Sequence, residues 1–494
     1  MVYLCVLDKY YFNGLFNHSC FFRNLQLSMT ATIFFYILIS ISIGLYFSKR
    51  VKTRDDFIRA GRNLPFIIIF AMVFATWFGA ETVLGISATF LEEGLSGLAS
   101  DPFGASACLI IFGIFFAKKL YRMNLITLGD FFRKKYNRHI EFTISILIII
   151  SYLGWISAQI TALGLVVFIL SDGIITKEFG ILLGSCIVLT YTIMGGMWAI
   201  ATTTFIQMVV ILIGLLLVSF EIVDLAGGLT NVIAKANFDG KLHVLPSIES
   251  LDFLLWIAAF LTMALGSIPQ QDVFQRANSA KNEKIASIGT TLGGLIYLVF
   301  ATIPLILAYS AFIIDPAGTS KLMEIDTQLV LPKLILLNTS DWIQILFFGS
   351  LISVILSTAA GTLLAPGVLF TQNVARYLGL ELGDKNFLKA TRISILLFTV
   401  MITIYAMSSN ETIHKMVENA YRVTLAGAFV PLVFGMFWKK ANSQGAGLAI
   451  TLGIFSWLFL EFFFADLIIE PQLVGLVFSF IGMIVGSLFI EKAK

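Results

Sequence analysis

The chain has 494 residues, of which 58% are hydrophobic and only 13% are charged, and its mean hydropathy is +0.91. A soluble chain of this length carries about a quarter charged residues, so the composition excludes a soluble protein and indicates an integral membrane protein. The net charge of +3 is too small to indicate a nucleic-acid partner. The four cysteines include no CxxC pair, which gives no sign of a disulfide framework or a zinc site.

Residues 1–28 are aromatic-rich with a weak, interrupted apolar run, and we expect an N-terminal extension rather than a signal peptide. Met29 stands just before the first clean apolar run and is an alternative translation start. A bilayer core of about 30 Å is crossed by about 20 helical residues. Runs of roughly that length predict an all-α protein with about 13 transmembrane helices, near residues 30–48, 65–95, 102–117, 140–170, 179–194, 203–225, 252–272, 285–314, 341–375, 388–408, 412–437, 446–465 and 472–490.

Lysine and arginine gather in alternate loops between these runs. Short basic loops stay on the cytoplasmic side of a membrane, and 24 of the 33 basic residues fall on one side when the spans are threaded in order. The two largest clusters lie at 49–62 and 118–138. We therefore expect a multi-pass protein of the plasma or inner cell membrane, with the N-terminus outside and the C-terminus in the cytoplasm.

Two long apolar runs are interrupted by glycine, proline and polar residues: ATWFGAET at 75–82 and GSIPQQD at 266–272. Irregular backbone at membrane depth must be satisfied by protein or water, and paired interruptions in two halves of a chain indicate an inverted-repeat transporter with a midplane site. Simple kinking of the helices is the alternative interpretation. The pattern predicts an extra helix, two five-helix core repeats and two C-terminal helices, at 30–48, 65–225, 252–437 and 446–490.

Three oxygen-bearing positions share one face of the predicted helix 341–375. Val354, Ser357 and Thr358 are spaced i, i+3 and i+4, which aligns one carbonyl and two hydroxyls. Oxygen ligands suit a hard cation such as Na⁺. Serine and threonine in membrane helices also bond back to their own helix or to a neighbour, so the spacing leaves both interpretations open.

Five groups of residues, in order and at matching spacing, resemble the motifs of a known family. They are FIRAGRNLP at 57–65, TLGDFFRKKY at 127–136, GGMWA at 195–199 with IQ at 206–207, QR at 275–276 with AK at 280–281, and PL, GMFWKKAN and GA at 431–432, 435–442 and 445–446. The chain thus resembles the sodium:solute symporter family, which includes sodium/proline, sodium/glucose, pantothenate and high-affinity choline transporters. The resemblance spans about residues 30–445 and implies a LeuT-type fold, a 5+5 inverted repeat with one helix before it.

The resemblance also implies a sodium site with Na⁺ as the coupling ion. Family members use two carbonyls of the first core helix, which match Ala75 and Phe78. They add one carbonyl and two hydroxyls of the eighth, which match Val354, Ser357 and Thr358. The last three are the residues that helical spacing singled out independently.

Two departures concern the number of sodium ions. Members thought to bind a second sodium carry an acidic residue where this chain has Thr204, and choline-type members carry another where it has Ala360. We therefore expect one Na⁺ per turnover and no other metal or cofactor.

Four short stretches look most like the choline-transporter branch: ATW at 75–77, PFG at 102–104, FFAK at 115–118 and WISA at 155–158. Trp77 and Trp155 match two rings of that branch's aromatic cage, in which cation–π attraction holds a quaternary ammonium. The other cage positions match Ala105 and Gln270, which argues against choline itself. We expect an amine, betaine-like or amino-acid zwitterion instead, with helix packing as the alternative role of both tryptophans.

Glu81 lies one turn beyond the first interruption, where sugar-transporting members have a glutamate that contacts substrate. An ionisable residue within the membrane is a functional candidate, although capping or pairing with a neighbouring helix is an alternative. The predicted substrate site is therefore Trp77, Glu81, Trp155 and Gln270.

Three further charged residues receive structural roles in this interpretation. Asp272 and Arg276, four residues apart at a predicted cytoplasmic helix end, are expected to form a structural pair or gate. Asp101 is expected in an outer loop.

Together these features predict a sodium-driven symporter that imports a small organic solute by alternating access. Its expected partners are the solute, Na⁺ and the lipid bilayer. We do not expect an enzyme, because the four histidines lie at loops or span ends and no catalytic motif is present. The alternatives are transport of a sugar or monocarboxylate by the same fold, or a sensor or channel that does not concentrate a solute.

Overall fold

The computed structural model describes residues 35–464 and 469–488. The predicted N-terminal extension and the alternative start at Met29 lie outside these ranges. Within the described residues, helix covers most of each of the thirteen apolar runs, with breaks inside several of them. In the described part of the chain, nine helices are long and apolar enough to cross a membrane, and the bent pair Leu251–Gly266 and Gln271–Asn278 makes ten.

The helices from the first interruption to residue 238 are α4 (Phe66–Trp77), α5 (Ile86–Glu93), α6 (Ala105–Ile111), α7 (Ala117–Arg122), α8 (Leu128–Lys135), α9 (Arg138–Leu170), α10 (Lys177–Leu225) and α11 (Leu229–Phe238). Before them lie Phe35–Ser48 and the short α3 (Arg54–Arg59). Wider π-helical turns at Glu81–Gly85, Ala99–Gly104 and Phe112–Phe116 join several of these helices.

The following helices are α12 (Leu251–Gly266), α13 (Gln271–Asn278), α14 (Glu283–Phe300), α15 (Thr302–Ile314), α16 (Pro316–Asp326), α17 (Val330–Asn338), α18 (Asp341–Leu369), α19 (Ala375–Tyr377), α20 (Asp384–Ser408), α21 (Ile413–Ala420), α22 (Arg422–Thr424), α23 (Val430–Phe437), α24 (Ser443–Phe463) and α25 (Pro471–Leu488). Further π-helical turns lie at Phe370–Val374 and Leu425–Phe429, and 3₁₀ turns lie at Ala60–Arg62, Gly94–Leu98 and Thr327–Leu329.

The helices break at the interruptions that the sequence predicts. α4 ends because Phe78 leaves the helical conformation, with ψ 76°. α12 and α13 are bent by 44° at their junction, where Pro269 has no N–H to continue the helix. α10 is also broken, at Gly196, whose φ of 52° favours glycine. A Cβ on Gly196 would lie 2.6 Å from the Phe57 ring, so the position also demands close approach.

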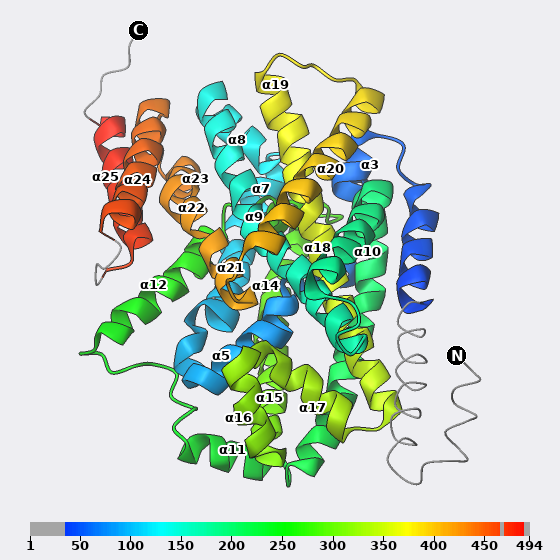
Figure 1. Ribbon diagram of the computed structural model, residues 1–494. Helices are drawn as coiled ribbons and strands as arrows, with labels where there is room; N and C mark the ends of the chain where they lie inside the picture. Colours follow the sequence, from blue (N-terminus) through cyan, green and yellow to red (C-terminus); the bar gives the residue numbers. More distant parts are fainter. Residues whose placement is uncertain (1–34, 465–468, 489–494) are drawn as a thin grey trace, which may run out of the picture.

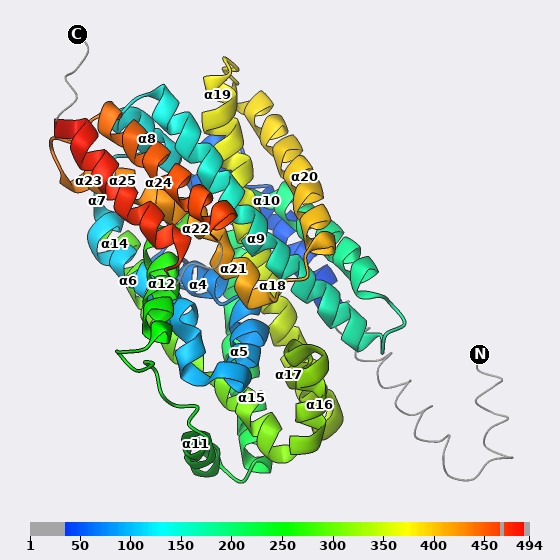
Figure 2. The same ribbon diagram turned by 60° about the vertical axis from the view of Figure 1, so that its left-hand side comes forward.

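α18 runs through the middle of the bundle (Figure 1) and belongs to the most completely buried of the apolar spans. It packs against α9 and α10 and touches both broken helices, α4 and α13. α24 and α25 pack on each other at one side, next to α23 (Figures 1 and 2). The broken helices are therefore held between long neighbours that supply side chains from several directions.

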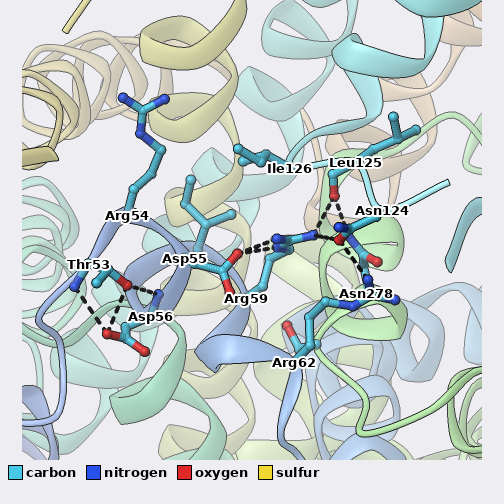
Figure 3. A network of polar contacts seen from close by, with 12 residues as sticks. Thr53, Arg54, Asp55, Asp56, Arg59, Arg62, Asn124, Leu125, Ile126 and Asn278 are labelled. Carbon is cyan, nitrogen blue, oxygen red and sulfur yellow. Dashed lines mark hydrogen bonds and ion pairs between the residues drawn. The ribbon is translucent and has the colours of Figure 1, made fainter. Parts of the chain in front are cut away.

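The predicted basic loops meet at one end of the molecule. Figure 3 shows Arg59 bridging from α3 to the loop before α8, where its Nη1 donates to Leu125 O (2.9 Å). Asn278, at the end of α13, donates to the same carbonyl (2.5 Å). Leu64 and Lys281 complete the junction, because the Lys281 N–H donates to Leu64 O (2.9 Å). α11, α16 and α17 lie at the opposite end (Figure 1).

Candidate functional site

Ser357 and Thr358 of α18 face the point at which α4 ends. The Ser357 hydroxyl lies 2.7 Å from Ala75 O and 2.9 Å from Val354 O, and Thr358 Oγ1 lies 3.4 Å from Ala75 O. All four residues are buried. Phe78, the fifth expected sodium ligand, caps α4 three positions after Ala75. The bond from Ser357 to another helix goes beyond the back-bonding that a serine makes within its own helix.

Three aromatic rings from different parts of the chain meet beside this point. Trp77 of α4 and Trp155 of α9 contact edge to face with centroids 5.5 Å apart. Tyr421, which follows α21, lies 6.4 Å from Trp77 and 5.8 Å from Trp155. Tyr421 is only 1% exposed, and its hydroxyl has no hydrogen-bond partner among the described residues. Tyr421 was not predicted from the sequence, because no pattern around α21 indicates which helix this ring faces.

Glu81 is buried against α9. The Trp155 indole N–H donates to Glu81 Oε1 (2.9 Å), and the Gln159 amide donates to Oε2 (2.5 Å). Gln159 also accepts the Ala80 N–H through its own oxygen (2.9 Å), so it ties the broken segment to α9. Gln159 lies one helical turn after Trp155, a spacing from which its role could have been inferred. Both donors to Glu81 are neutral, and its negative charge has no cationic partner in the described structure.

Asp272 and Arg276 form the predicted ion pair, with Arg276 Nη1 3.3 Å from Asp272 Oδ2. The contacts of the pair extend beyond its own helix. Both residues are almost fully buried. Asp272 also accepts the Trp77 indole N–H (3.2 Å) and the Tyr152 hydroxyl (2.7 Å), and Arg276 Nε donates to Thr76 Oγ1 (3.0 Å). The pair therefore joins α13 to α4 and α9, and it contacts the Trp77 ring through the indole N–H.

Gln270, the remaining predicted substrate residue, lies at the break between α12 and α13. Its side-chain amide donates to Ser151 Oγ of α9 (2.8 Å) and lies 3.5 Å from Thr424 Oγ1. Trp77, Glu81 and Trp155 are thus in direct contact with one another or linked by one hydrogen bond. Gln270 is connected to these three residues indirectly, through Ser151 on α9, the helix of Trp155, and through Thr424, which lies three residues after Tyr421.

The expectation that Asp101 lies in an outer loop is wrong. Asp101 belongs to the π-helical turn Ala99–Gly104 and is 1% exposed. It accepts a hydrogen bond from the Tyr297 hydroxyl and lies 3.4 Å from Thr82 Oγ1. Loop residues and helix starts look alike in sequence here, because the glycines on either side obscure where the helix begins.

Two cavities lie at opposite ends of the described molecule. The larger cavity, of about 580 Å³, is lined by His414 of α21 and by Gly85, which lies one helical turn beyond Glu81. Six carboxylate side chains line it: Glu92, Glu93, Asp252, Asp326, Glu418 and Glu470. The smaller, of about 210 Å³, lies at the basic end beside Arg54 and Arg376. The expected sodium and substrate residues are 3% exposed or less, so the site itself is closed.

The model of the sodium:solute symporter family matches residues 57–453, which is most of the chain. The chain therefore belongs to the sodium:solute symporter family. It is a multi-pass membrane transporter of a family that couples solute movement to Na⁺. The family is one of transporters.

Individual relatives agree with this assignment. The high-affinity choline transporter 1 of Torpedo marmorata is 25% identical over 451 residues, covering 86% of this chain and 75% of the relative. Sodium/proline symporter 2 of Staphylococcus saprophyticus is 24% identical, covering 93% and 92%. A solved Na⁺-coupled sialic acid symporter is 20% identical with a TM-score of 0.81, covering 93% and 97%. The last likeness confirms the LeuT-type fold.

Proposed function

We propose that this chain imports a small cationic or zwitterionic amine together with Na⁺ across the plasma or inner cell membrane, with the N-terminus outside and the C-terminus in the cytoplasm. The observation that carries the proposal is the convergence of three rings, Trp77, Trp155 and Tyr421, beside a buried carboxylate, Glu81. A cation over an aromatic face gains about 0.5 to 2 kcal/mol, more when water is excluded. An amine-bearing solute fits both features.

Charge favours an amine over the alternative of a sugar. Asp272 is already paired with Arg276, whereas Glu81 is held by neutral donors alone. A buried carboxylate without a cationic partner is costly in free energy. A bound ammonium group next to Glu81 would offset that cost, whereas a neutral sugar or an anionic monocarboxylate would leave the charge uncompensated.

The larger cavity supports the same cargo class. Besides its six carboxylates, the lining holds the imidazole of His414 and one lysine, Lys415. A cleft lined by one sign of charge concentrates ions of the opposite sign, so this cavity would attract both Na⁺ and a cationic solute. It lies away from the basic loops and so, by the distribution of lysine and arginine, on the outer side.

The sodium ligands in this proposal are Ala75, Phe78, Val354, Ser357 and Thr358. Sodium would bind the freed carbonyls at the end of α4 and the two hydroxyls of α18, in place of the present bond from Ser357 to Ala75. It would therefore order the broken segment that also carries Trp77 and Glu81. In this scheme the two core repeats are 65–225 and 252–437, and alternating access moves them relative to each other around the site.

The test is uptake by the full-length protein in proteoliposomes. Labelled choline, glycine betaine, proline and glucose are offered under an inward Na⁺ gradient, with a K⁺ gradient as the control. We expect one of the first three to accumulate above its external concentration only with Na⁺. Preferred uptake of glucose would contradict the cargo class, and equilibration without accumulation would indicate a channel or a sensor instead.

A further inference from the structure

Asp101 stands in a cluster of oxygen atoms that the proposed transport site does not use. Thr82 Oγ1 lies 3.1 Å from Tyr297 Oη, 3.4 Å from Asp101 Oδ2 and 3.4 Å from the Trp77 carbonyl oxygen. Tyr297 also hydrogen-bonds Asp101 Oδ1 directly. The four residues come from the first broken helix, the turn before α6, and α14, and each is 3% exposed or less.

The charge of this cluster is not balanced by protein. Within the described residues, Asp101 forms no ion pair with any lysine, arginine or histidine. Glu81, the residue before Thr82 in the chain, is also acidic and therefore adds negative charge to the cluster. Isolated carboxylates inside a membrane protein are costly and mark ion or proton pathways.

The spacing of the oxygens suits a bound ion. Calcium, a cation of nearly the size of sodium, holds its oxygen ligands at about 2.3–2.6 Å, so ligands at right angles around such an ion lie about 3.2–3.7 Å apart. Two of the separations, from Thr82 Oγ1 to Asp101 Oδ2 and to the Trp77 carbonyl oxygen, are 3.4 Å and lie in this range, whereas the contacts of Tyr297 Oη are closer and would have to widen around an ion. The Trp77 carbonyl is available because it stands in the last turn of α4, where carbonyls have no helical partner.

We propose that Asp101, Thr82, Tyr297 and the carbonyl of Trp77 form a second sodium site, separate from the one at Ser357 and Thr358. The inference rests on the proposed function, since it assumes a sodium-coupled cycle. It differs from the expectation of one sodium per turnover, which considered only the acidic positions replaced by Thr204 and Ala360. Asp101 supplies the negative charge from a different helix.

The two sodium sites would share one segment of backbone. Ala75 and Phe78 belong to the first site, and Trp77 and Thr82 belong to the second. The Trp77 ring meanwhile faces the proposed cargo. Binding at either site would therefore order the same broken stretch of chain. A second ion would also square the limit on accumulation: one Na⁺ under 100 mV and a tenfold gradient supports roughly 500-fold accumulation of a neutral or zwitterionic cargo.

The experiment counts ²²Na⁺ ions bound by the purified full-length protein. We expect two per chain in the wild type and one in Asp101→Asn, which keeps the size of the side chain. Ser357→Ala/Thr358→Ala should also bind one. Tyr297→Phe removes one ligand but keeps the ring that packs against Phe78 at 6.0 Å, so it should bind the second ion about tenfold more weakly. Glu324→Gln, the same change of charge on an exposed helix, should still bind two.

Each outcome has a separate meaning. One ion in both the wild type and Asp101→Asn would overturn the second site and leave the proposed symport intact. No sodium binding by the wild type would instead overturn the proposed function. An unchanged sodium count in Asp101→Asn with an altered pH dependence of uptake would show that Asp101 carries a proton, which also contradicts this inference. If Asp101→Asn does not fold, Tyr297→Phe decides by its binding curve.

Discussion

Trp77 takes part in the candidate site through three different groups. Its ring contacts Trp155, its indole N–H donates to Asp272, and its carbonyl oxygen faces Thr82. A substitution at this position therefore removes different interactions according to what remains. Leucine removes the aromatic face and the N–H together, whereas phenylalanine keeps a face and loses only the N–H. The backbone carbonyl remains in both.

We expect Trp77→Leu to weaken cargo binding by about 1 to 2 kcal/mol, because a cation loses its aromatic face. Trp77→Phe should cost less. The measurement is the cargo dissociation constant of the purified protein in saturating Na⁺. Trp342→Leu is the matched control, because Trp342 is 54% exposed and lies at the first turn of α18, about three turns before Val354. Equal affinity in Trp77→Leu and the wild type would assign Trp77 to helix packing.

At the scale of the helix, the break in α4 connects α18 to the cargo site. The Ala75 carbonyl accepts a hydrogen bond from the Ser357 hydroxyl. Two residues later, the ring of Trp77 contacts the rings of Trp155 and Tyr421. On the other side, Gln159 of α9 holds the Ala80 N–H and the Glu81 carboxylate. A continuous helix would bond these backbone groups to itself and leave none for an ion. The break is therefore what makes the segment responsive to sodium.

Ser357→Ala/Thr358→Ala should abolish Na⁺-stimulated uptake, because it removes both hydroxyl ligands of the first sodium site. Membrane insertion and thermal unfolding in the absence of Na⁺ should change little. Thr362→Ala serves as the control one turn further along α18. Among the described residues, the Thr362 hydroxyl bonds only to carbonyls of its own helix, those of Thr358 and Ala359. Wild-type sodium activation in the double variant would refute the assignment.

At the scale of the whole molecule, the two ends differ in charge and in closure. The acidic cavity reaches within one turn of Glu81. At the other end Arg376 bonds Asp130 (2.7 Å) and Glu141, and so links α19 to α8 and α9. The site is therefore buried in this structure, and the acidic cavity is the one that reaches towards it. We therefore expect these ion pairs to separate when the basic end opens.

We expect Na⁺ and cargo to tighten each other's binding by the same factor, since coupling between two sites is reciprocal. Couplings of this kind typically amount to about 5- to 150-fold. The factor is measured by titrating cargo at zero and saturating Na⁺, and Na⁺ at zero and saturating cargo, on purified protein. Equal affinities with and without the other ligand would mean that the broken segment does not couple the two sites.

The sequence by itself determined the membrane class, the all-helical fold and the positions of both helix breaks. Apolar run length and the special backbones of glycine and proline are local properties, so they can be read without a fold. Helical spacing likewise placed Val354, Ser357 and Thr358 on one face. The family resemblance singled out Trp77, Glu81 and Trp155, and their roles in binding stay a prediction.

Only the tertiary structure decided which helix faces lie opposite one another. It brought Tyr421 against the two tryptophans, turned Asp272 towards Trp77, and buried Asp101 beside Tyr297. The periodicity of one helix shows which of its residues share a face but carries no information about the distant helix that covers it. That choice depends on the packing of the whole bundle, which is why the aromatic cluster and the second oxygen cluster appear only in the folded chain.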